Sequence, residues 1–435
     1  MDLTSRLRSI VRPQGATPRE LTYEPDTGRY EATIDLDRVA DVLGGRIVAN
    51  DFGRALVVDR RYESERFHGQ RRVGECAFAD GDTLRLLDPG LPEAAGARER
   101  TVFVDLETTG LSGGAGTVAF LVGVGWFDMG AFQVRQFLLT SYASERALLC
   151  AVADAFDAAT LLVTYNGKTF DVPVMETRWM FHRMRMPLES IRHFDMLHPA
   201  RRLWRARAGA VSEENGGCRL ATLERVLCGV TRAGDIPGMD IPGRYFQFLR
   251  SGDARPLEPV MEHNRLDLIS LAAVTAHAVA LVEDGTPRCR DAAEAIALGK
   301  VYERAGCAPR AIACYEHAAG DPSADMDVTA EALYRLGLRL RRERRFIDAA
   351  AVWRRILDLK QGRSGRRSAL LAPLRQFAVE ALAIHHEHRE KDYEGARELT
   401  LRLLEEDLGV HEHGRHRLER LERKIARKND SHLFA

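Results

Sequence analysis

Two carboxylates interrupt the most apolar strand-forming segment of this chain. The segment FVDLETTG, residues 103–110, places Asp105 and Glu107 two positions apart among Val, Phe and Leu. Side chains alternate between the faces of a strand, so both acids project from one side, roughly 6 to 7 Å apart. Adjacent carboxylates repel each other unless a positive charge lies between them. A divalent cation held by carboxylate oxygens is the favoured interpretation, and an edge strand with two solvated acids is the alternative.

The kinds of secondary structure that the chain favours change twice along its length. Residues 1–96 mix short β-branched segments with turn residues, so we expect a strand-rich N-terminal accessory segment. Over residues 97–285, adjacent strand candidates precede alternating helices and strands, which predicts an α/β domain with a partly antiparallel sheet. Residues 286–435 have Ala, Leu, Arg and Glu at helical period, which predicts an all-α domain. The strand candidates are residues 101–107, 117–127, 132–139 and 160–166, and a helix is expected over 144–156.

Small and aromatic residues recur at fixed spacing in the all-α part. In two copies, a Leu-Gly pair is followed by an Ala twelve residues after the Gly and by an aromatic residue four further on. Small residues let paired helices approach closely, while large ones fill the groove beside them. This spacing predicts tetratricopeptide-like helical repeats, and a third copy places Ala396 at the small position. The copies are Leu298, Gly299, Tyr302, Ala311 and Tyr315, and then Leu336, Gly337, Ala349 and Trp353.

The composition is that of an ordinary globular protein. Lys and Arg together number 63, as do Asp and Glu, so any affinity for a polyanion must come from local charge. The seven cysteines are an odd number without C-x-x-C spacing, which predicts reduced thiols and argues against a disulfide framework or structural zinc. We find no secretory signal and no apolar run near the roughly 18 residues that span a bilayer. A cytoplasmic protein without a membrane partner is therefore expected.

A second acidic signal follows the strand candidate at 160–166. Asn166 and Gly167 predict a turn that lifts the chain from the sheet, and Asp171 follows at the start of an expected helix. The neighbouring letters GKT are not a phosphate-binding loop, because that motif needs a Gly where Leu162 stands. Asp171 is therefore either a further acid at the rim of the sheet or the N-cap of its helix.

A third signal lies in a helix predicted over residues 261–279. This helix carries His263 and Asp267. Residues four apart share one face of a helix, so the imidazole and the carboxylate can point into the same site. A solvated surface pair is the alternative, and it is disfavoured because this is the third acidic signal in one α/β domain.

Together these motifs resemble a known family. Asp-x-Glu on a first strand, Asn-x-x-x-Phe-Asp on a later element and a final helical Asp preceded by His resemble the DEDD exonucleases of the ribonuclease H-like superfamily. The closer resemblance is to the bacterial YprB type, which includes the mitomycin-repair exonucleases. The strings that carry it are TTGLSGGAGTVAFLVG, YNGKTFD, DIPG, IPGRYF and EHNRLDLISL, within residues 97–285. The resemblance implies a ribonuclease H-like exonuclease domain, with a mixed sheet flanked by helices, followed by an all-α tetratricopeptide-like domain.

The resemblance also implies roles for the acids. Asp105, Glu107, Asp171 and Asp267 would hold two divalent metal ions, Mg²⁺ or Mn²⁺, and His263 would be the general base. His263 stands four residues before Asp267. Members of this family that use Tyr have the Tyr at this spacing. Asp195, in RHFDML, is expected to support these residues through a hydrogen bond rather than to bind metal.

Local positive charge predicts a polyanionic substrate. Residues 178–207 contain eight Arg against two acids, and residues 335–367 contain twelve Lys or Arg against three. Arg beside aromatic residues suits phosphate contact and base stacking, although a solvated basic helix face is the alternative. The interleaved aromatics are Trp179, Phe181, Phe194 and Trp204, and the residues expected to bind substrate are Thr108, Asn166, Lys168, Arg201 and Arg202. The Gly-rich residues 111–117 are expected to form a tight turn with room for a 3′ end.

Three functions remain open at this point. The leading one is a metal-dependent 3′-to-5′ exonuclease acting on DNA in repair, beside a helicase, as the resemblance implies. The second is an RNA-processing exonuclease with the same chemistry, because the acids do not read the 2′-hydroxyl. The third is an inactive nuclease fold whose helical repeats bind partners. The intact set of four acids argues against this scaffold, and the sequence does not predict an oligomeric state.

Overall fold

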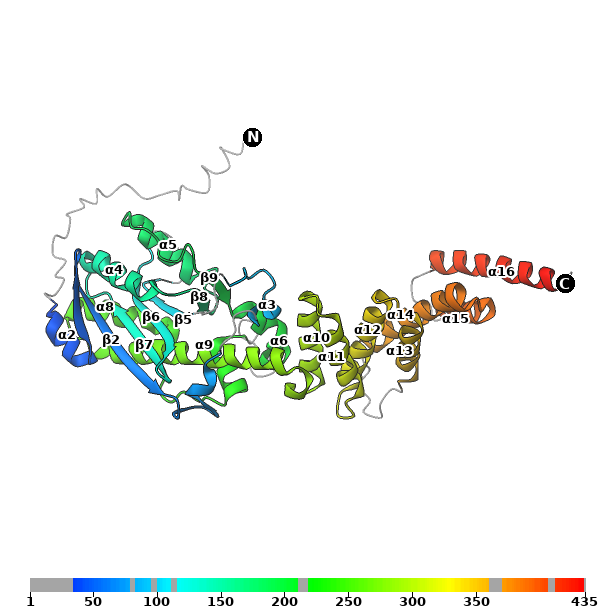
Figure 1. Ribbon diagram of the computed structural model, residues 1–435, viewed down its shortest axis with the longest axis horizontal. Coiled ribbons are helices and arrows are strands. Elements are labelled where there is room, and N and C mark those ends of the chain that lie inside the picture. The colour runs from blue at the N-terminus through cyan, green and yellow to red at the C-terminus, as the bar shows by residue number, and fades with distance from the viewer. Residues whose placement is uncertain are drawn as a thin grey trace, which may run out of the picture.

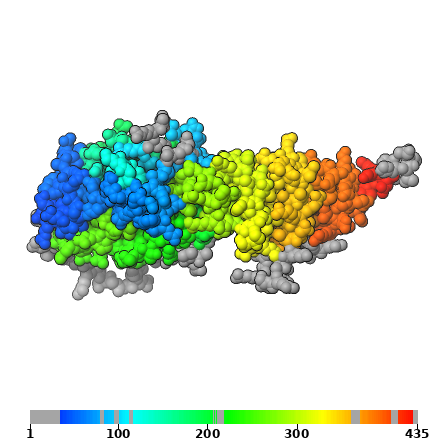
Figure 2. Space-filling model, turned by 60° about the horizontal axis from the view of Figure 1, so that its bottom comes forward, coloured from blue at the N-terminus to red at the C-terminus, as the bar shows by residue number. Residues whose placement is uncertain are grey.

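The computed structural model describes residues 34–78, 83–94, 100–110, 116–209, 218–359, 370–405 and 411–433. Within these residues the molecule is elongated, with a sheet and its helices forming the broad end and further helices extending away from it (Figures 1 and 2). The predicted α/β unit followed by an all-α region is confirmed.

One mixed sheet of seven strands forms the centre of the α/β unit. Its spatial order is β1-β2-β7-β6-β5-β8-β9. In this order, each of β1, β2, β7, β6 and β5 is antiparallel to its neighbour, whereas β8 and β9 run parallel to β5. The strands are β1 (Arg46–Asn50), β2 (Gly53–Glu63), β5 (Thr101–Thr108), β6 (Ala119–Asp128), β7 (Ala131–Leu138), β8 (Leu161–Thr164) and β9 (Arg192–Asp195). The parallel pairing matters for function because it brings the carboxyl ends of β5, β8 and β9 to one edge.

The expected N-terminal segment is strand-rich, but its strands are not separate from the rest. β2 pairs along its length with β7, with Leu56 opposite Leu138, and β1 closes the edge of the same sheet. The division expected near residue 96 therefore does not coincide with a break in the sheet. Pairing between strands far apart in the chain leaves no local periodicity, which is why the sequence did not reveal it.

Side chains of β5 alternate between two apolar layers. Val102, Val104 and Leu106 pack into a core with α4 (Glu145–Phe156), α5 (Asp171–Phe181) and α8 (Ile241–Ser251). Phe103 faces the other core, which contains much of α9 (Glu258–Asp284). The other helices of this unit are α2 (Leu36–Leu43), α3 (Leu84–Leu87), α6 (Leu197–Gly209) and α7 (Leu220–Leu223). Helices thus flank both faces of the sheet, as expected.

Helix α9 corrects one expectation drawn from the sequence. The segment Arg255–Asp284 is long and apolar enough, by length and composition, to cross a bilayer. Its most apolar window is 78% buried inside the protein, as in the core helix of a soluble domain. The expectation that no apolar run approaches the length of a membrane span was therefore wrong, because a helix that is buried over most of its surface has no continuous polar face to interrupt its apolar run.

The helical region repeats one contact. A side chain at Gly299 on α10 would overlap the Tyr315 ring on α11, and one at Gly337 on α12 would overlap the Trp353 ring on α13. Ala396 on α15 is fully buried, as the third copy requires. The helices are α10 (Ala292–Arg304), α11 (Ala308–Gly320), α12 (Met326–Arg342), α13 (Phe346–Asp358), α14 (Leu371–His385), α15 (Tyr393–Glu405) and α16 (His411–Leu433). Their assignment to the tetratricopeptide class stays a prediction.

A buried ion pair joins α4 to α5. Glu145 accepts a hydrogen bond from Arg178 Nε over 2.6 Å and lies 2.8 Å from His182 Nε2. Both members of the Arg178–Glu145 pair are almost fully buried.

All seven cysteines are free thiols, as expected, so no disulfide contributes to the stability of the fold.

We expect Glu145→Gln to lower the free energy of unfolding by about 3 to 5 kcal/mol, because it removes the carboxylate charge that pairs with the buried Arg178 guanidinium. Urea unfolding followed by circular dichroism measures this loss. The matched control is Glu63→Gln, which removes an exposed pair with Arg61 and should change stability little. Equal stability of the two variants would contradict the prediction.

Candidate active site

The two acids of β5 lie near its carboxyl end. Asp105 and Glu107 project from the face that Phe103 occupies, opposite the apolar side chains of the other core. β8 runs parallel to β5, so the turn that follows β8 rises at the same edge. Asp171 opens helix α5 directly after this turn and is 6% exposed. The topology therefore brings the first three predicted acids to one edge of the sheet.

The turn that delivers Asp171 is held by Asp195. Asn166 adopts a left-handed conformation with φ 69°, as the predicted turn requires. Asp195, at the end of β9, accepts hydrogen bonds from the backbone N–H of Asn166 over 2.8 Å and of Lys168 over 3.0 Å. Asp195 therefore holds the turn, and its exclusion from the metal ligands stays a prediction.

Helix α9 approaches β5 closely through an amide side chain. Asn264 Nδ2 donates to the backbone oxygen of Asp105 over 3.1 Å and to its Oδ2 over 2.8 Å. Gln136 of β7 donates in turn to Asn264 Oδ1 over 2.8 Å. Gly123 of β6 lies beneath this amide, where any side chain would overlap it. Asn264, Gln136 and Gly123 therefore fix the Asp105 carboxylate, and sequence reasoning missed all three.

Asp267 is held by a buried guanidinium. Arg232 donates from Nη2 to Asp267 Oδ1 over 2.5 Å, from Nε to Glu224 over 2.6 Å and from Nη1 to Asp235 over 3.0 Å. His263 lies between two of these acids, with Nδ1 2.7 Å from Asp235 Oδ1 and Nε2 3.5 Å from Asp267 Oδ2. The helical spacing thus places His263 beside Asp267 as predicted, whereas the roles of Arg232, Asp235 and Glu224 were not foreseen. The DIPG string that contains Asp235 was the available signal.

Negative charge accumulates among the four acids. Burial, followed by the charges of Asp267, Glu107 and Asp171, raises the pKa of Asp105 well above its ordinary value. Burial, followed by the charges of Asp267 and Asp171, likewise raises the pKa of Glu107. Burial raises the pKa of Asp171 to about 7. When neighbouring carboxyl groups disfavour one another's ionisation in this way, a bound cation stabilises their ionised form.

The residues expected to bind substrate come from β5, from the turn before Asp171 and from α6. Thr108 is buried at the end of β5 and donates from Oγ1 to the Gly110 oxygen over 2.8 Å, while Asn166 and Lys168 lie on the turn before Asp171. Lys168 Nζ is 3.1 Å from Asp88 Oδ2. Arg201 and Arg202 lie on α6, which packs against α10. The first three therefore lie next to the acids in the chain, and Arg202 approaches the same turn, since it donates to the Leu87 oxygen over 3.0 Å beside Asp88, the partner of Lys168.

The base-stacking interpretation of residues 178–207 is wrong for most of their aromatic residues. Trp179, Phe194 and Trp204 are each at most 1% exposed, because large apolar rings gain more from burial than from solvent. Phe181 is 65% exposed, with the Arg178 guanidinium 4.6 Å from its ring centre. Of the second basic stretch, residues 360–367 lie outside the described residues, as do residues 111–115 of the Gly-rich turn.

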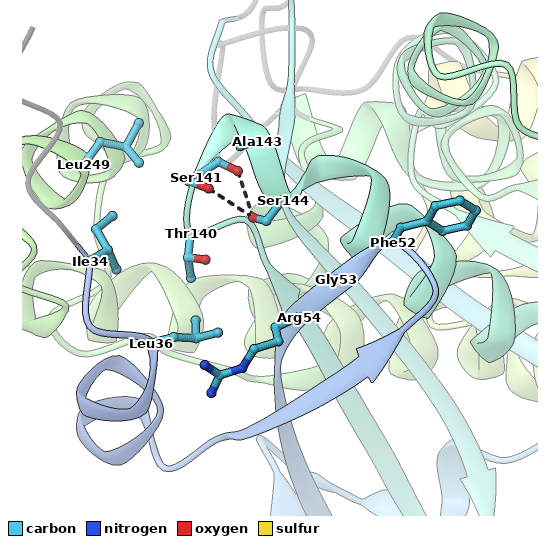
Figure 3. Close-up of a pocket in the computed structure, with 10 residues that line it drawn as sticks. All are labelled: Ile34, Leu36, Phe52, Gly53, Arg54, Thr140, Ser141, Ala143, Ser144 and Leu249. Atoms are coloured by element: carbon cyan, nitrogen blue, oxygen red, sulfur yellow. Dashed lines mark hydrogen bonds between the residues drawn. The ribbon is translucent and has the colours of Figure 1, made fainter.

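A separate cavity of about 520 Å³ lies at another part of the sheet (Figure 3). It opens beside the start of β2 and the loop that follows β7, where Ser144 Oγ donates to the Ser141 oxygen over 2.8 Å. Phe52 and Arg54 also line it, and none of the four acids does. This cavity is therefore distinct from the acidic cluster.

The acids fall within a region that matches a known family. A model of the RNase H superfamily matches residues 102–279, from β5 into α9. A Bacillus subtilis (strain 168) protein, named uncharacterized protein YprB, is 32% identical over 292 residues. That match covers 67% of this chain and 66% of the relative, so this chain spans slightly less than two thirds of that protein. Residues 102–279 of this chain, which contain the four acids and His263, form a domain of the RNase H superfamily.

Proposed function

We propose that this protein is a DEDD-type nuclease that hydrolyses nucleic-acid phosphodiester bonds from the 3′ end with the help of divalent metal ions. The single observation that carries the proposal is the convergence of acids from β5, α5 and α9 on one edge of the sheet. The RNase H-like domain makes a nucleic-acid hydrolase the coarse expectation. The DEDD subtype and the direction rest on the motif resemblance.

The donor set fits a hard divalent cation. Asp105, Glu107, Asp171 and Asp267 offer carboxylate oxygens, which Mg²⁺ and Mn²⁺ prefer. Burial and the charges of the neighbouring acids raise the pKa values of Asp105 and Glu107. We propose two such ions. When bound, they would lower the pKa of a water and stabilise the leaving 3′ oxygen.

His263 is our proposed general base. A carboxylate only accepts hydrogen bonds, so His263 Nδ1 carries the proton in its 2.7 Å contact with Asp235 Oδ1. Nε2 is then the basic nitrogen, and it lies on the Asp267 side of the ring. Asp235 therefore fixes the tautomer that can take a proton from an attacking water.

DNA is our preferred substrate, with a role in repair beside a helicase, and the cytoplasm is the proposed compartment. These assignments rest on the resemblance to repair exonucleases. RNA is the second candidate substrate, because none of the described contacts distinguishes the two sugars. The inactive scaffold is disfavoured, since all four acids are present and near one another.

The deciding experiment incubates the purified full chain with single- and double-stranded DNA and RNA, labelled at either end, in Mg²⁺ or Mn²⁺. We expect stepwise release of nucleotides from 3′ ends, and complete inhibition by a chelator. Release from 5′ ends would overturn the direction, preference for RNA would favour the second candidate, and no hydrolysis of any substrate would favour the scaffold.

Substrate binding should weaken steeply with salt. Each phosphate neutralised by Lys or Arg releases condensed counterions, so the logarithm of the affinity falls by about 0.7 per phosphate contact for each tenfold rise in salt on a single strand. Fluorescence anisotropy in Ca²⁺, with a labelled single strand and an Asp171→Asn variant to prevent hydrolysis, measures the slope. Affinity that does not change with salt would contradict binding through phosphates.

A further inference from the structure

Three potential metal ligands converge far from the acidic cluster, in the helical region. His386, Glu390 and Asp392 lie where α14 passes through one π-helical turn, His386–Glu390, before α15 begins. One ligand atom from each lies within 4.8 Å of those of the other two. Within the part of the chain that the structure describes, no other group of His, Cys, Asp and Glu side chains meets this criterion.

The backbone of this turn is shaped to bring the three side chains together. π-helical turns are rare in proteins, and many of those that occur lie at functional sites. Lys391 then adopts a left-handed conformation with φ 55°, and the N–H of Asp392 donates to the His386 oxygen over 3.0 Å. The chain thereby folds back, so that Asp392 lies against the ring of His386 although they are six residues apart.

Each carboxylate uses one oxygen elsewhere and turns the other toward His386. Asp392 Oδ1 accepts from the N–H of Gly395 over 3.0 Å in the first turn of α15, whereas its Oδ2 lies 3.1 Å from His386 Nδ1. Glu390 Oε1 lies 3.3 Å from His385 Nε2, whereas its Oε2 lies 2.8 Å from His386 Nδ1. Because His385 is buried, its contact with Oε1 restricts the position of the Glu390 carboxylate.

Hydrogen bonding does not account for the nitrogen at the centre of this group. His386 Nδ1 is buried and forms no hydrogen bond, although two carboxylate oxygens lie close to it. Zn²⁺ bonds of about 2.0 to 2.2 Å in tetrahedral geometry separate neighbouring ligand atoms by roughly 3.3 to 3.6 Å. The distances from His386 Nδ1 to the Glu390 and Asp392 oxygens are shorter, at 2.8 and 3.1 Å. One imidazole nitrogen with two carboxylate oxygens suits Zn²⁺ and its first-row neighbours better than Mg²⁺.

We propose that His386, Glu390 and Asp392 bind a divalent transition-metal ion, with Zn²⁺ as the best fit, through Nδ1, Oε2 and Oδ2. The three ligands come from the end of α14 and the residues before α15, so the ion joins the two helices at their connection. A fourth position is left for water. This site is independent of the acidic cluster, and its failure would leave the nuclease proposal untouched.

The test uses the untagged full chain with Asp105→Asn and Asp171→Asn, which removes two acids of the other cluster. Titration calorimetry of the metal-free protein with Zn²⁺ should reveal one site per chain. Loss of supporting groups around bound metals costs about 10- to 100-fold in affinity, so loss of a direct ligand in His386→Gln should weaken binding at least as much. His388→Gln is the matched control, because that imidazole is 55% exposed on the same turn.

A second readout guards against misfolding. Asn is as good a helix N-cap as Asp, so Asp392→Asn should keep the start of α15 while removing one anionic ligand. Circular dichroism should be unchanged, and zinc affinity should fall as it does in His386→Gln. Co²⁺ should give visible absorption bands that both variants lose. Absence of a zinc site, or a site that neither variant weakens, would show that the group is an ion-pair cluster only.

Discussion

Replacing Asp105 by asparagine is expected to reduce metal-dependent hydrolysis by roughly a thousandfold or more. Metal stabilisation of transition-state charge contributes several kcal/mol, and each 1.36 kcal/mol corresponds to about a tenfold change in rate. Asn264 already donates to Asp105, so the variant amide can still be accommodated beside it. Single-turnover assays on end-labelled DNA measure the loss. The control is Glu176→Gln, because Glu176 is exposed on α5, one turn beyond Asp171.

The same change should stabilise the metal-free protein. In the folded state burial, and then the charges of the other acids, raise the pKa of Asp105, so ionisation at neutral pH costs free energy that the neutral amide avoids. The pKa of Asp171 rises from 3.8 to about 7, so the stability it contributes is fully present below about pH 4 and is lost as the pH rises to about 7. Metal-free wild type should therefore lose more stability between about pH 5 and pH 8 than Asp171→Asn does.

Mn²⁺ should raise the melting temperature of wild type but not that of Asp105→Asn. Equal stabilisation of the two proteins by Mn²⁺ would argue against a metal site.

Removing His263 should slow hydrolysis while leaving metal binding nearly intact. General bases contribute about 10²- to 10⁴-fold, so His263→Asn should lower kcat by roughly that factor. Asp235→Asn should have a smaller effect of the same kind, because an amide can donate to Nδ1 and so favours the wrong tautomer. Rapid-quench kinetics with saturating substrate, together with calorimetric Mn²⁺ titration, separates the two properties.

Glu258→Gln provides the control for these variants, since Glu258 is exposed in the first turn of the same helix. A variant of His263 with full kcat would remove it from the mechanism. Weakened Mn²⁺ binding with unchanged kcat would instead make it a support for Asp267.

The parts of the site that follow from local spacing were predictable. Alternation along β5 places Asp105 and Glu107 on one face, and the four-residue spacing on α9 places His263 beside Asp267. Strong strands such as β6 and β7 were likewise recognised within two residues of their ends, because their apolar runs are long. These features depend only on neighbours in the chain.

The parts that depend on distant partners were not predictable. Asn264 contacts Asp105, 159 positions away, and Gln136 contacts Asn264, 128 positions away. No periodicity encodes such a pair, and an Asn in a helix is equally compatible with solvent. Arg232 resembled an ordinary charged residue, although three acids surround it and its side chain is 6% exposed. Trp204 was misjudged for the same reason, since local sequence does not say which face of α6 is covered.

Helix α9 contacts both the acidic cluster and the helical region. Its first half carries Asn264 and Asp267, and the carbonyl of Val282 in its last turn accepts hydrogen bonds from Tyr302 and Arg310 of the following helices (Figure 1). Both sets of contacts are therefore made by one continuous helix, Glu258–Asp284. The helical region therefore covers the last turns of the helix that carries Asn264 and Asp267, and shortening the protein just after Asp284 would expose the apolar side chains of those turns.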